Sequence, residues 1–122
     1  PNLGGVYENV VAQELAAQDV DLWYYQSEAA GEVDFLMEGK SGNVIPIEVK
    51  SGKKVRAHAA LDHLMGIRDY KLEEAFVLSR NNLSQEDAIT YAPLYMTFCL
   101  SELTEQDAGD FTFAPRPAVS GS

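Results

Sequence analysis

The stretch IPIEVKSG, residues 45–52, carries two charges inside a run that otherwise has the composition of a buried β-strand. Side chains alternate across a strand, so Glu48 and Lys50 are expected on one face and Ile47 and Val49 on the other. A carboxylate beside an ammonium can take part in proton transfer or stabilise a phosphate. The same two residues can instead form a structural ion pair on the sheet, and the sequence leaves both interpretations open.

A second carboxylate comes close to Glu48 if two neighbouring strands pair. Residues 32–38 alternate apolar and polar side chains, with Val33 and Phe35 expected on the face opposite Asp34. Pairing of this strand with the next one would place Asp34 beside Glu48. Two converging carboxylates repel each other, and burying them is costly unless a cation compensates.

A divalent metal ion can provide that compensation. Mg²⁺ prefers oxygen ligands and is typically held by one or two carboxylates, with phosphate oxygens completing its shell. Asp34 and Glu48 are therefore candidate ligands for Mg²⁺ or Mn²⁺. Lys50 could orient the attacking water or stabilise charge on the phosphate. The chemistry indicated is metal-assisted hydrolysis of a phosphodiester.

A third carboxylate comes from a predicted helix near the start of the chain. Glu8 shares one helical face with Val11, Ala12 and Leu15 by spacings of three and four residues. An acid on this core-facing side could bind the metal directly or through water. The alternative is a partly exposed acid near the helix N-terminus, where its charge favours the helix dipole.

The elements that must position these residues follow the order αβββαββ. Helical spacing of apolar residues predicts helices over residues 2–18 and 58–70, and the Gly- and Asn-containing turn after residue 38 indicates a hairpin. The fold class is α/β with a mixed sheet. The apolar positions of the first helix are Leu3, Val6, Val10, Val11 and Leu15. The predicted strands are residues 21–26, 32–38, 44–51, 74–79 and 89–100, the last broken or bulged near Pro93.

Length and composition favour a single domain. With 122 residues, of which 46% are hydrophobic, the chain can form one core but not two. We expect a globular domain over residues 1–103 and a short extension with a flexible tail over 104–122. Ser101 could cap a short terminal helix, with Thr104 and Glu105 in its first turn. No apolar run is long enough to span a bilayer and no signal peptide is present. The single cysteine, Cys99, favours a reducing cytoplasm.

The net charge of -10 argues against a general nucleic-acid-binding surface, because phosphate binding depends on lysine and arginine. The middle third of the chain nevertheless contains a basic run, formed by Lys50, Lys53, Lys54 and Arg56. On charge alone this run is best interpreted as a solvated loop after a strand. Beside a nuclease site, its last three members would instead guide phosphates towards Lys50.

Other chemistries find less support. His58 and His63 are five residues apart, which suits neither spacing of paired helical ligands, and no second cysteine completes a zinc site. The aromatic residues Trp23, Tyr24 and Tyr25 are typical of sheet packing rather than base stacking. No phosphate-binding loop of the Walker type occurs.

The arrangement resembles a known superfamily of nucleases. An acid on the first helix, Asp34 on the second strand and Glu48-Val49-Lys50 on the third resemble the PD-(D/E)XK superfamily, whose core is the restriction-endonuclease-like fold. More narrowly, GGVYENVVAQEL, GEVDFLMEGKSGNVIPIEVKSGKKV and APLYMTF resemble the uncharacterised domain at the C-terminus of many prokaryotic AAA-type ATPases. The resemblance runs from about residue 3 to residue 100.

This resemblance implies a three-layer core with a central mixed sheet flanked by helices. It also implies that Asp34 and Glu48 bind the metal, that Lys50 assists catalysis and that Glu8 supports the site. Val33 replaces the proline that precedes the aspartate in the superfamily motif. The implied partners are DNA and an ATPase domain N-terminal to this one in the parent chain. The alternative is a catalytically inactive domain of the same fold that binds a protein or a nucleic acid.

Overall fold

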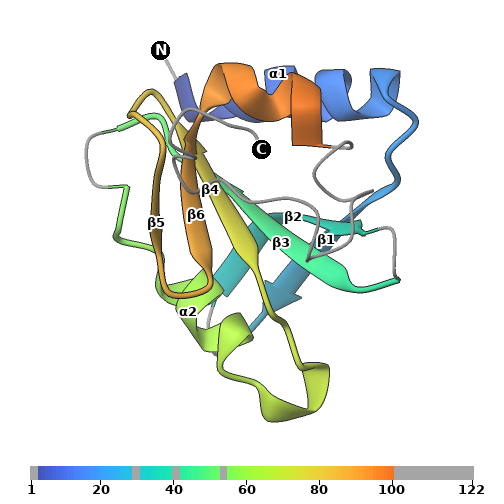
Figure 1. Cartoon of the computed structure of the whole chain (residues 1–122), viewed down its shortest axis with the longest axis vertical. Coiled ribbons are helices and arrows are strands. Elements are labelled where there is room, and N and C mark those ends of the chain that lie inside the picture. The colour runs from blue at the N-terminus through green and yellow to red at the C-terminus, as the bar shows by residue number, and fades with distance from the viewer. Residues whose placement is uncertain (1–2, 29–30, 40–41, 53–54, 101–122) are drawn as a thin grey trace, which may run out of the picture.

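The computed structural model describes residues 3–28, 31–39, 42–52 and 55–100. Within these residues two α-helices, six strands and two 3₁₀-helices alternate along the chain (Figure 1). In order, they are α1 (Leu3–Ala17), β1 (Leu22–Ser27), β2 (Gly31–Glu38), β3 (Val44–Val49), α2 (Ala59–Met65), η1 (Arg68–Tyr70), β4 (Ala75–Ser79), β5 (Ser84–Glu86), β6 (Ile89–Pro93) and η2 (Leu94–Cys99).

The strands form one mixed sheet in the order β1-β2-β3-β4-β6-β5. β1, β2 and β3 pair antiparallel, as expected for consecutive strands joined by short turns. β3, β4 and β6 run parallel to one another, and β5 returns antiparallel at the edge. The mixed α/β class predicted from the sequence is therefore confirmed.

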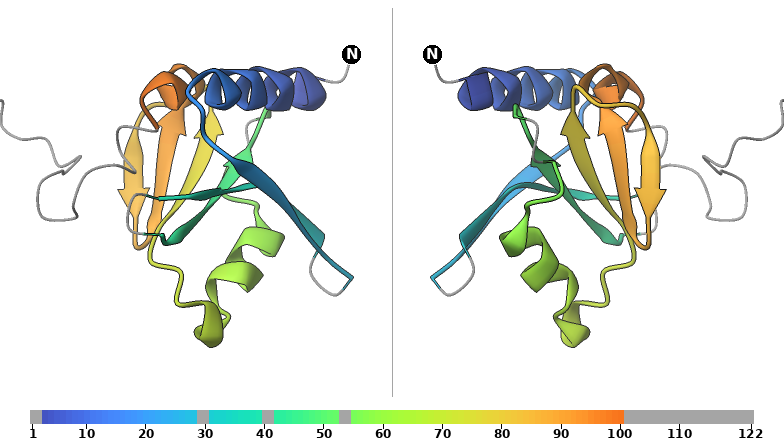
Figure 2. Two further views of the ribbon diagram at one scale, coloured as in Figure 1. Left: turned by 90° about the vertical axis from the view of Figure 1, so that its right-hand side faces the viewer. Right: turned by 90° about the vertical axis from the view of Figure 1, so that its left-hand side faces the viewer.

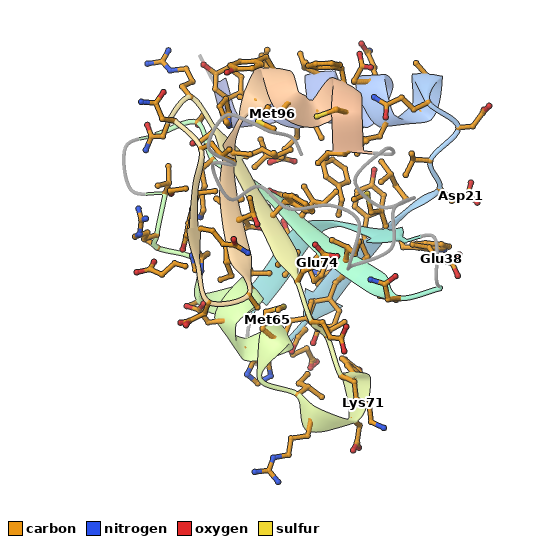
Figure 3. The ribbon with its side chains drawn as sticks, in the orientation of Figure 1. Asp21, Glu38, Met65, Lys71, Glu74 and Met96 are labelled. Carbon is orange, nitrogen blue, oxygen red and sulfur yellow. The ribbon has the colours of Figure 1, made fainter. Side chains whose placement is uncertain are left out.

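Helices cover both faces of this sheet. α1 and η2 lie together on one face and α2 lies on the other (Figure 2). Met96 of η2 and Met65 of α2 accordingly pack on opposite sides of the sheet (Figure 3). β4 lies between these two layers, and all five of its residues are buried, as is typical of a central parallel strand.

A β-bulge in β2 changes which side chains share a face. The pairing with β1 shifts between Trp23 and Tyr25, so Asp34 and Phe35 of β2 together oppose a single residue of β1. Val33 therefore packs in the core cluster on the α2 side, whereas Phe35 packs in the cluster on the α1 side. The prediction that these two apolar residues share one face was wrong, because the extra residue reverses the alternation.

The first helix presents a narrower apolar face to the sheet than its sequence suggests. Val11 and Leu15 are fully buried, but Val6 and Val10 are each 52% exposed. Successive helical residues are about 100° apart, so a helix that buries Val11 and Leu15 turns Val10 away from the sheet. The side chain of Leu3 lies outside the described residues.

Two predicted elements end at other residues than expected, and one strand was not predicted. The helix predicted over residues 58–70 ends at Met65, and Gly66 caps it before the separate 3₁₀-helix η1. The strand predicted over residues 89–100 ends at Pro93, which has an extended backbone and begins the turns of η2. β5 was not predicted, because its sequence SQE is polar and all three residues are exposed.

Several expectations fall outside the described part of the chain. The domain boundary at residues 103–104 and the helix after Ser101 are among them. In the described residues, no helix combines the length and apolar character needed to cross a membrane.

Candidate functional site

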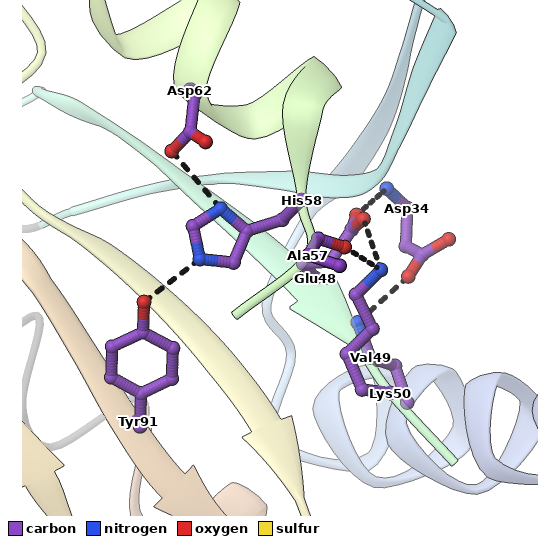
Figure 4. A network of polar contacts seen from close by, with 8 residues as sticks. All are labelled: Asp34, Glu48, Val49, Lys50, Ala57, His58, Asp62 and Tyr91. Atoms are coloured by element: carbon purple, nitrogen blue, oxygen red, sulfur yellow. Dashed lines mark hydrogen bonds and ion pairs between the residues drawn. The ribbon is translucent and has the colours of Figure 1, made fainter. Parts of the chain in front are cut away.

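Asp34 and Glu48 meet where the backbone pairing of β2 with β3 ends. The last residues paired through their backbones are Phe35 and Ile47, and beyond them side chains take over from backbone carbonyls as acceptors. The Asp34 N–H donates to Glu48 Oε1 at 3.2 Å, and the Val49 N–H donates to Asp34 Oδ2 at 2.7 Å (Figure 4). Each carboxylate is thus fixed by a main-chain N–H of the neighbouring strand.

Lys50 follows directly after β3 and turns its ammonium towards the same place. Its Nζ lies 3.6 Å from Glu48 Oε2 and donates a hydrogen bond of 2.7 Å to the carbonyl oxygen of Ala57 (Figure 4). The backbone of Lys50 is held by its N–H, which donates to the carbonyl of Leu78 in β4. The structure therefore brings together Asp34, Glu48 and Lys50.

Burial raises the pKa of both carboxyls, and the charge of Asp34 raises that of Glu48 further. Burial, followed by the negative charge of Asp34, raises the pKa of Glu48 from 4.5 to about 7. Burial also raises the pKa of Asp34, although the Val49 N–H and the charge of Lys50 act in the opposite direction. The pair is therefore short of positive charge when both groups are ionised, since Lys50 alone does not restore their ordinary pKa values.

Glu8 of α1 lies beside this pair of carboxylates. Its side chain is partly buried, and burial, the charges of Asp34 and Glu32, and a hydrogen bond with Asp34 all raise its pKa. This interaction places Glu8 next to Asp34 rather than alone at the helix end.

The carboxylate pair, rather than a set of three ligands, is what could hold a metal ion. Across residues 3–28, 31–39, 42–52 and 55–100, no group of three or more His, Cys, Asp or Glu side chains is arranged as a metal site. Mg²⁺ needs only one or two protein carboxylates when phosphate and water complete its shell. Asp34 and Glu48 fit that requirement, because they supply oxygen donors and lack compensating positive charge.

Arg56 is the only member of the predicted nucleic-acid-binding run that can be placed. Its Nε donates to Glu86 Oε1 at 3.1 Å, and its guanidinium lies 4.3 Å from the centre of the Tyr91 ring. Arg56 therefore contacts β5 and β6 through its side chain. Lys53 and Lys54 lie outside the described residues.

A buried histidine close to the carboxylates was not recognised as part of the site. His58 is 6% exposed, and its Nε2 lies 2.8 Å from the hydroxyl of Tyr91. Its Nδ1 lies 3.0 Å from Asp62 Oδ1, an ion-pair distance when the ring is protonated (Figure 4). The spacing of four residues between His58 and Asp62 was a usable signal, but Tyr91 is 33 residues away from His58.

The family of the chain follows from a comparison with known proteins. A family model described as "Domain of unknown function (DUF4143)" matches residues 3–97, which is most of the chain. The chain belongs to the DUF4143 family. The matched residues extend from α1 into η2 and include the carboxylate pair and Lys50. Searches of the curated proteins and of the solved structures find no match to it.

The DUF4143 domain also has an apolar groove near the N-terminal half of α1. It encloses about 470 Å³ between α1, the loop after β4 and the start of η2. The exposed Val6 and Val10 line one side and Tyr95, 74% exposed, lines the other. Arg80 lies on the rim, where its guanidinium donates to the hydroxyl of Tyr7 at 3.4 Å.

Proposed function

We propose that this DUF4143 domain has the restriction-endonuclease-like fold of the PD-(D/E)XK superfamily and hydrolyses phosphodiester bonds with Mg²⁺ or Mn²⁺. The observation that carries the proposal is the convergence of Asp34, Glu48 and Lys50 at the end of β2 and β3. Their order along the chain agrees with the motif, and main-chain N–H groups hold both carboxylates in place.

The proposed roles follow from the geometry of each group. Asp34 and Glu48 would hold the metal, and Glu8, beside Asp34, would support it directly or through water. When bound, a divalent ion neutralises charge on the phosphate and lowers the pKa of a bound water. Lys50 would use its remaining donors to stabilise the phosphate or hold the attacking water, since an ammonium carries three N–H groups.

The raised pKa values support a cation at this place. Glu48 has a pKa of about 7 in the folded chain, so it is largely protonated below that pH. A divalent ion would favour the ionised forms of Glu48 and Asp34 and offset their repulsion. Metal affinity should therefore increase as the pH rises through about 7.

The same proposal extends to the parent protein, its substrate and its location in the cell. The domain would follow an AAA-type ATPase domain in its parent protein, which would position DNA or gate access to the site. With a net charge of -10, the isolated domain would bind and cut DNA poorly. The parent protein would be cytoplasmic, where Cys99 stays reduced.

A second candidate function is an interaction module without catalysis. The observation that favours it is the exposed apolar surface around the groove, where Val6, Val10, Tyr95 and Phe98 are each more than half exposed. Apolar patches of this kind often mark protein-protein interfaces. Such a module would keep binding its partner when Asp34 and Glu48 are neutralised.

A cleavage assay with site variants tests the proposal. The full-length parent protein is incubated with labelled DNA or RNA and Mn²⁺, as wild type, Glu48→Gln and Lys50→Ala. We expect cleavage by wild type and a loss of at least about a hundredfold in both variants, because Glu48→Gln removes a metal ligand and Lys50→Ala removes the group that holds the phosphate or the attacking water. Glu38→Gln, an exposed change at the far end of β2, is the matched control and should cleave as wild type. Cleavage that persists unchanged in both site variants would contradict the assignment.

A further inference from the structure

The ammonium of Lys50 is held mainly by the segment that precedes α2. Its hydrogen bond to the Ala57 carbonyl is 2.7 Å long, whereas its distance to Glu48 Oε2 is 3.6 Å. Only the first distance lies in the range of a strong charge-assisted hydrogen bond. The position of the Ala57 carbonyl therefore decides where the ammonium lies relative to the carboxylate pair.

Ala57 is itself exposed, so its carbonyl must be held in place by its neighbours. Val55 is 3% exposed and packs in the core cluster on the α2 side. Arg56 stacks on the ring of Tyr91 and pairs with Glu86. His58 follows directly and is buried. Three residues around Ala57 are thus anchored, and each anchor is separate from the carboxylate pair.

The anchor of His58 is the most directional of the three. Its Nε2 is hydrogen-bonded to the Tyr91 hydroxyl, and its Nδ1 lies 3.0 Å from Asp62 Oδ1, where the two groups attract each other when the ring is protonated although no hydrogen bond forms. Tyr91 is 3% exposed and lies opposite Val77 of the central strand β4. The hydrogen bond between His58 and Tyr91 therefore ties the segment before α2 to the buried centre of the sheet (Figure 4).

We propose that His58 is a positioning residue for Lys50. Held between Tyr91 and Asp62, it fixes the Ala57 carbonyl, which in turn directs the ammonium of Lys50 to the carboxylate pair. The catalytic importance of this positioning rests on the proposed nuclease function. The placement of the Lys50 ammonium is independent of that function, because it depends only on contacts within the domain.

The test measures the reactivity of Lys50 without metal or nucleic acid. The full chain is labelled with a trace of acetic anhydride, and mass spectrometry gives the acetylation rate of Lys50 relative to Lys71. Lys71 is an exposed reference at the end of η1 (Figure 3). Tyr91→Phe keeps the aromatic ring and removes only the hydroxyl that contacts His58. We expect the relative rate of Lys50 to rise about fivefold, which corresponds to about 1 kcal/mol, the net contribution of a typical hydrogen bond.

Two further variants make the result specific. Tyr95→Phe removes an exposed hydroxyl of η2 and should leave the Lys50 rate unchanged. Asp62→Asn changes a carboxylate whose side chain is 59% exposed, so it should fold as wild type and raise the rate about twofold. A role of His58 in folding alone would lower the melting temperature of Tyr91→Phe without changing the relative rate of Lys50.

The proposal is overturned if Lys50 keeps its wild-type relative rate in Asp62→Asn and in folded Tyr91→Phe. Should Tyr91→Phe fail to fold, the result for Asp62→Asn decides alone. A raised Lys50 rate in a protein that never cleaves nucleic acid would refute the nuclease function and leave the positioning role intact. An unchanged Lys50 rate in a protein that does cleave nucleic acid would refute the positioning role and leave the nuclease function intact.

Discussion

Among single residues, Glu48 couples the stability of the fold most strongly to pH. Burial and the charge of Asp34 raise its pKa from 4.5 to about 7 in the folded chain. Between these pH values the folded state keeps a proton that the unfolded state has released. The free energy of unfolding therefore falls as the pH rises. This contribution is complete below pH 4.5 and is lost above a pH of about 7.

Glu48→Gln should remove that pH dependence. The amide oxygen of Gln can still accept from the Asp34 N–H, but no charge is buried. We expect the variant to gain about 1–3 kcal/mol over wild type between pH 5 and pH 8, since one pKa unit corresponds to about 1.4 kcal/mol. Urea unfolding across this range measures the difference. For the control Glu38→Gln, the difference in free energy of unfolding from wild type should not change with pH. If the difference for Glu48→Gln were also independent of pH, the buried charge of Glu48 would not be the cause.

Asp34 should matter to the fold through its oxygen more than through its charge. Its Oδ2 accepts from the partly buried Val49 N–H at 2.7 Å. Asp34→Asn keeps an oxygen acceptor there, whereas Asp34→Ala leaves the N–H unsatisfied, at a cost of about 1–3 kcal/mol. Chemical denaturation at pH 7 should therefore rank Asp34→Ala well below Asp34→Asn. Equal stability of the two variants would show that the bond contributes nothing.

Among the elements, α1 offers a matched test of its orientation. Val11 is fully buried and its neighbour Val10 is 52% exposed, although both looked like core residues in the sequence. Val11→Ala should cost about 2 kcal/mol, because it removes two buried methyl groups and leaves a cavity. Val10→Ala should change the free energy of unfolding by less than about 0.5 kcal/mol. The opposite ranking in thermal or urea unfolding would mean that the helix is rotated.

The elements also show how far the sequence alone could go. Alternation along two adjacent strands was enough to predict that Asp34 and Glu48 meet, because a hairpin brings its strands together in a set register. The bulge at Asp34 and Phe35 was not predictable, because helices cover both faces of the sheet, so Val33 and Phe35 are both buried on either side of the bulge and the sequence keeps a regular alternation. The strand β5 was missed for a similar reason, because its three residues carry no apolar face.

The contacts that anchor the segment before α2 lay beyond sequence reasoning, although the pairing of Lys50 with Glu48 was predicted. The hydrogen bond between His58 and Tyr91 joins residues 33 positions apart, and only the packing of α2 against β4 and β6 brings them together. Local spacing indicates neighbours three or four residues away on a helix, such as His58 and Asp62. It does not indicate partners on a distant strand.

For the whole molecule, the acidic charge limits how the domain can bind nucleic acid. Its net charge is -10, and the basic run beyond Lys50 offers only Lys53, Lys54 and Arg56. We expect weak binding of the isolated domain to duplex DNA, with a shallow dependence on salt. Lys53→Gln combined with Lys54→Gln should reduce the slope of log affinity against log salt by about 2, because each phosphate that a lysine neutralises contributes roughly 0.9 to that slope. Fluorescence anisotropy measures this, and an unchanged slope would exclude the two lysines from the interface.

Divalent metal binding to the carboxylate pair is the property on which the proposed function depends most. Isothermal titration calorimetry of Mn²⁺ into the domain at pH 8, where Glu48 is mostly ionised, measures it directly. We predict saturable binding at one site in wild type and in Glu38→Gln, and its loss in Asp34→Asn and Glu48→Gln. Binding that survives in both site variants, or no binding to wild type up to millimolar metal, would contradict the proposed metal-dependent nuclease.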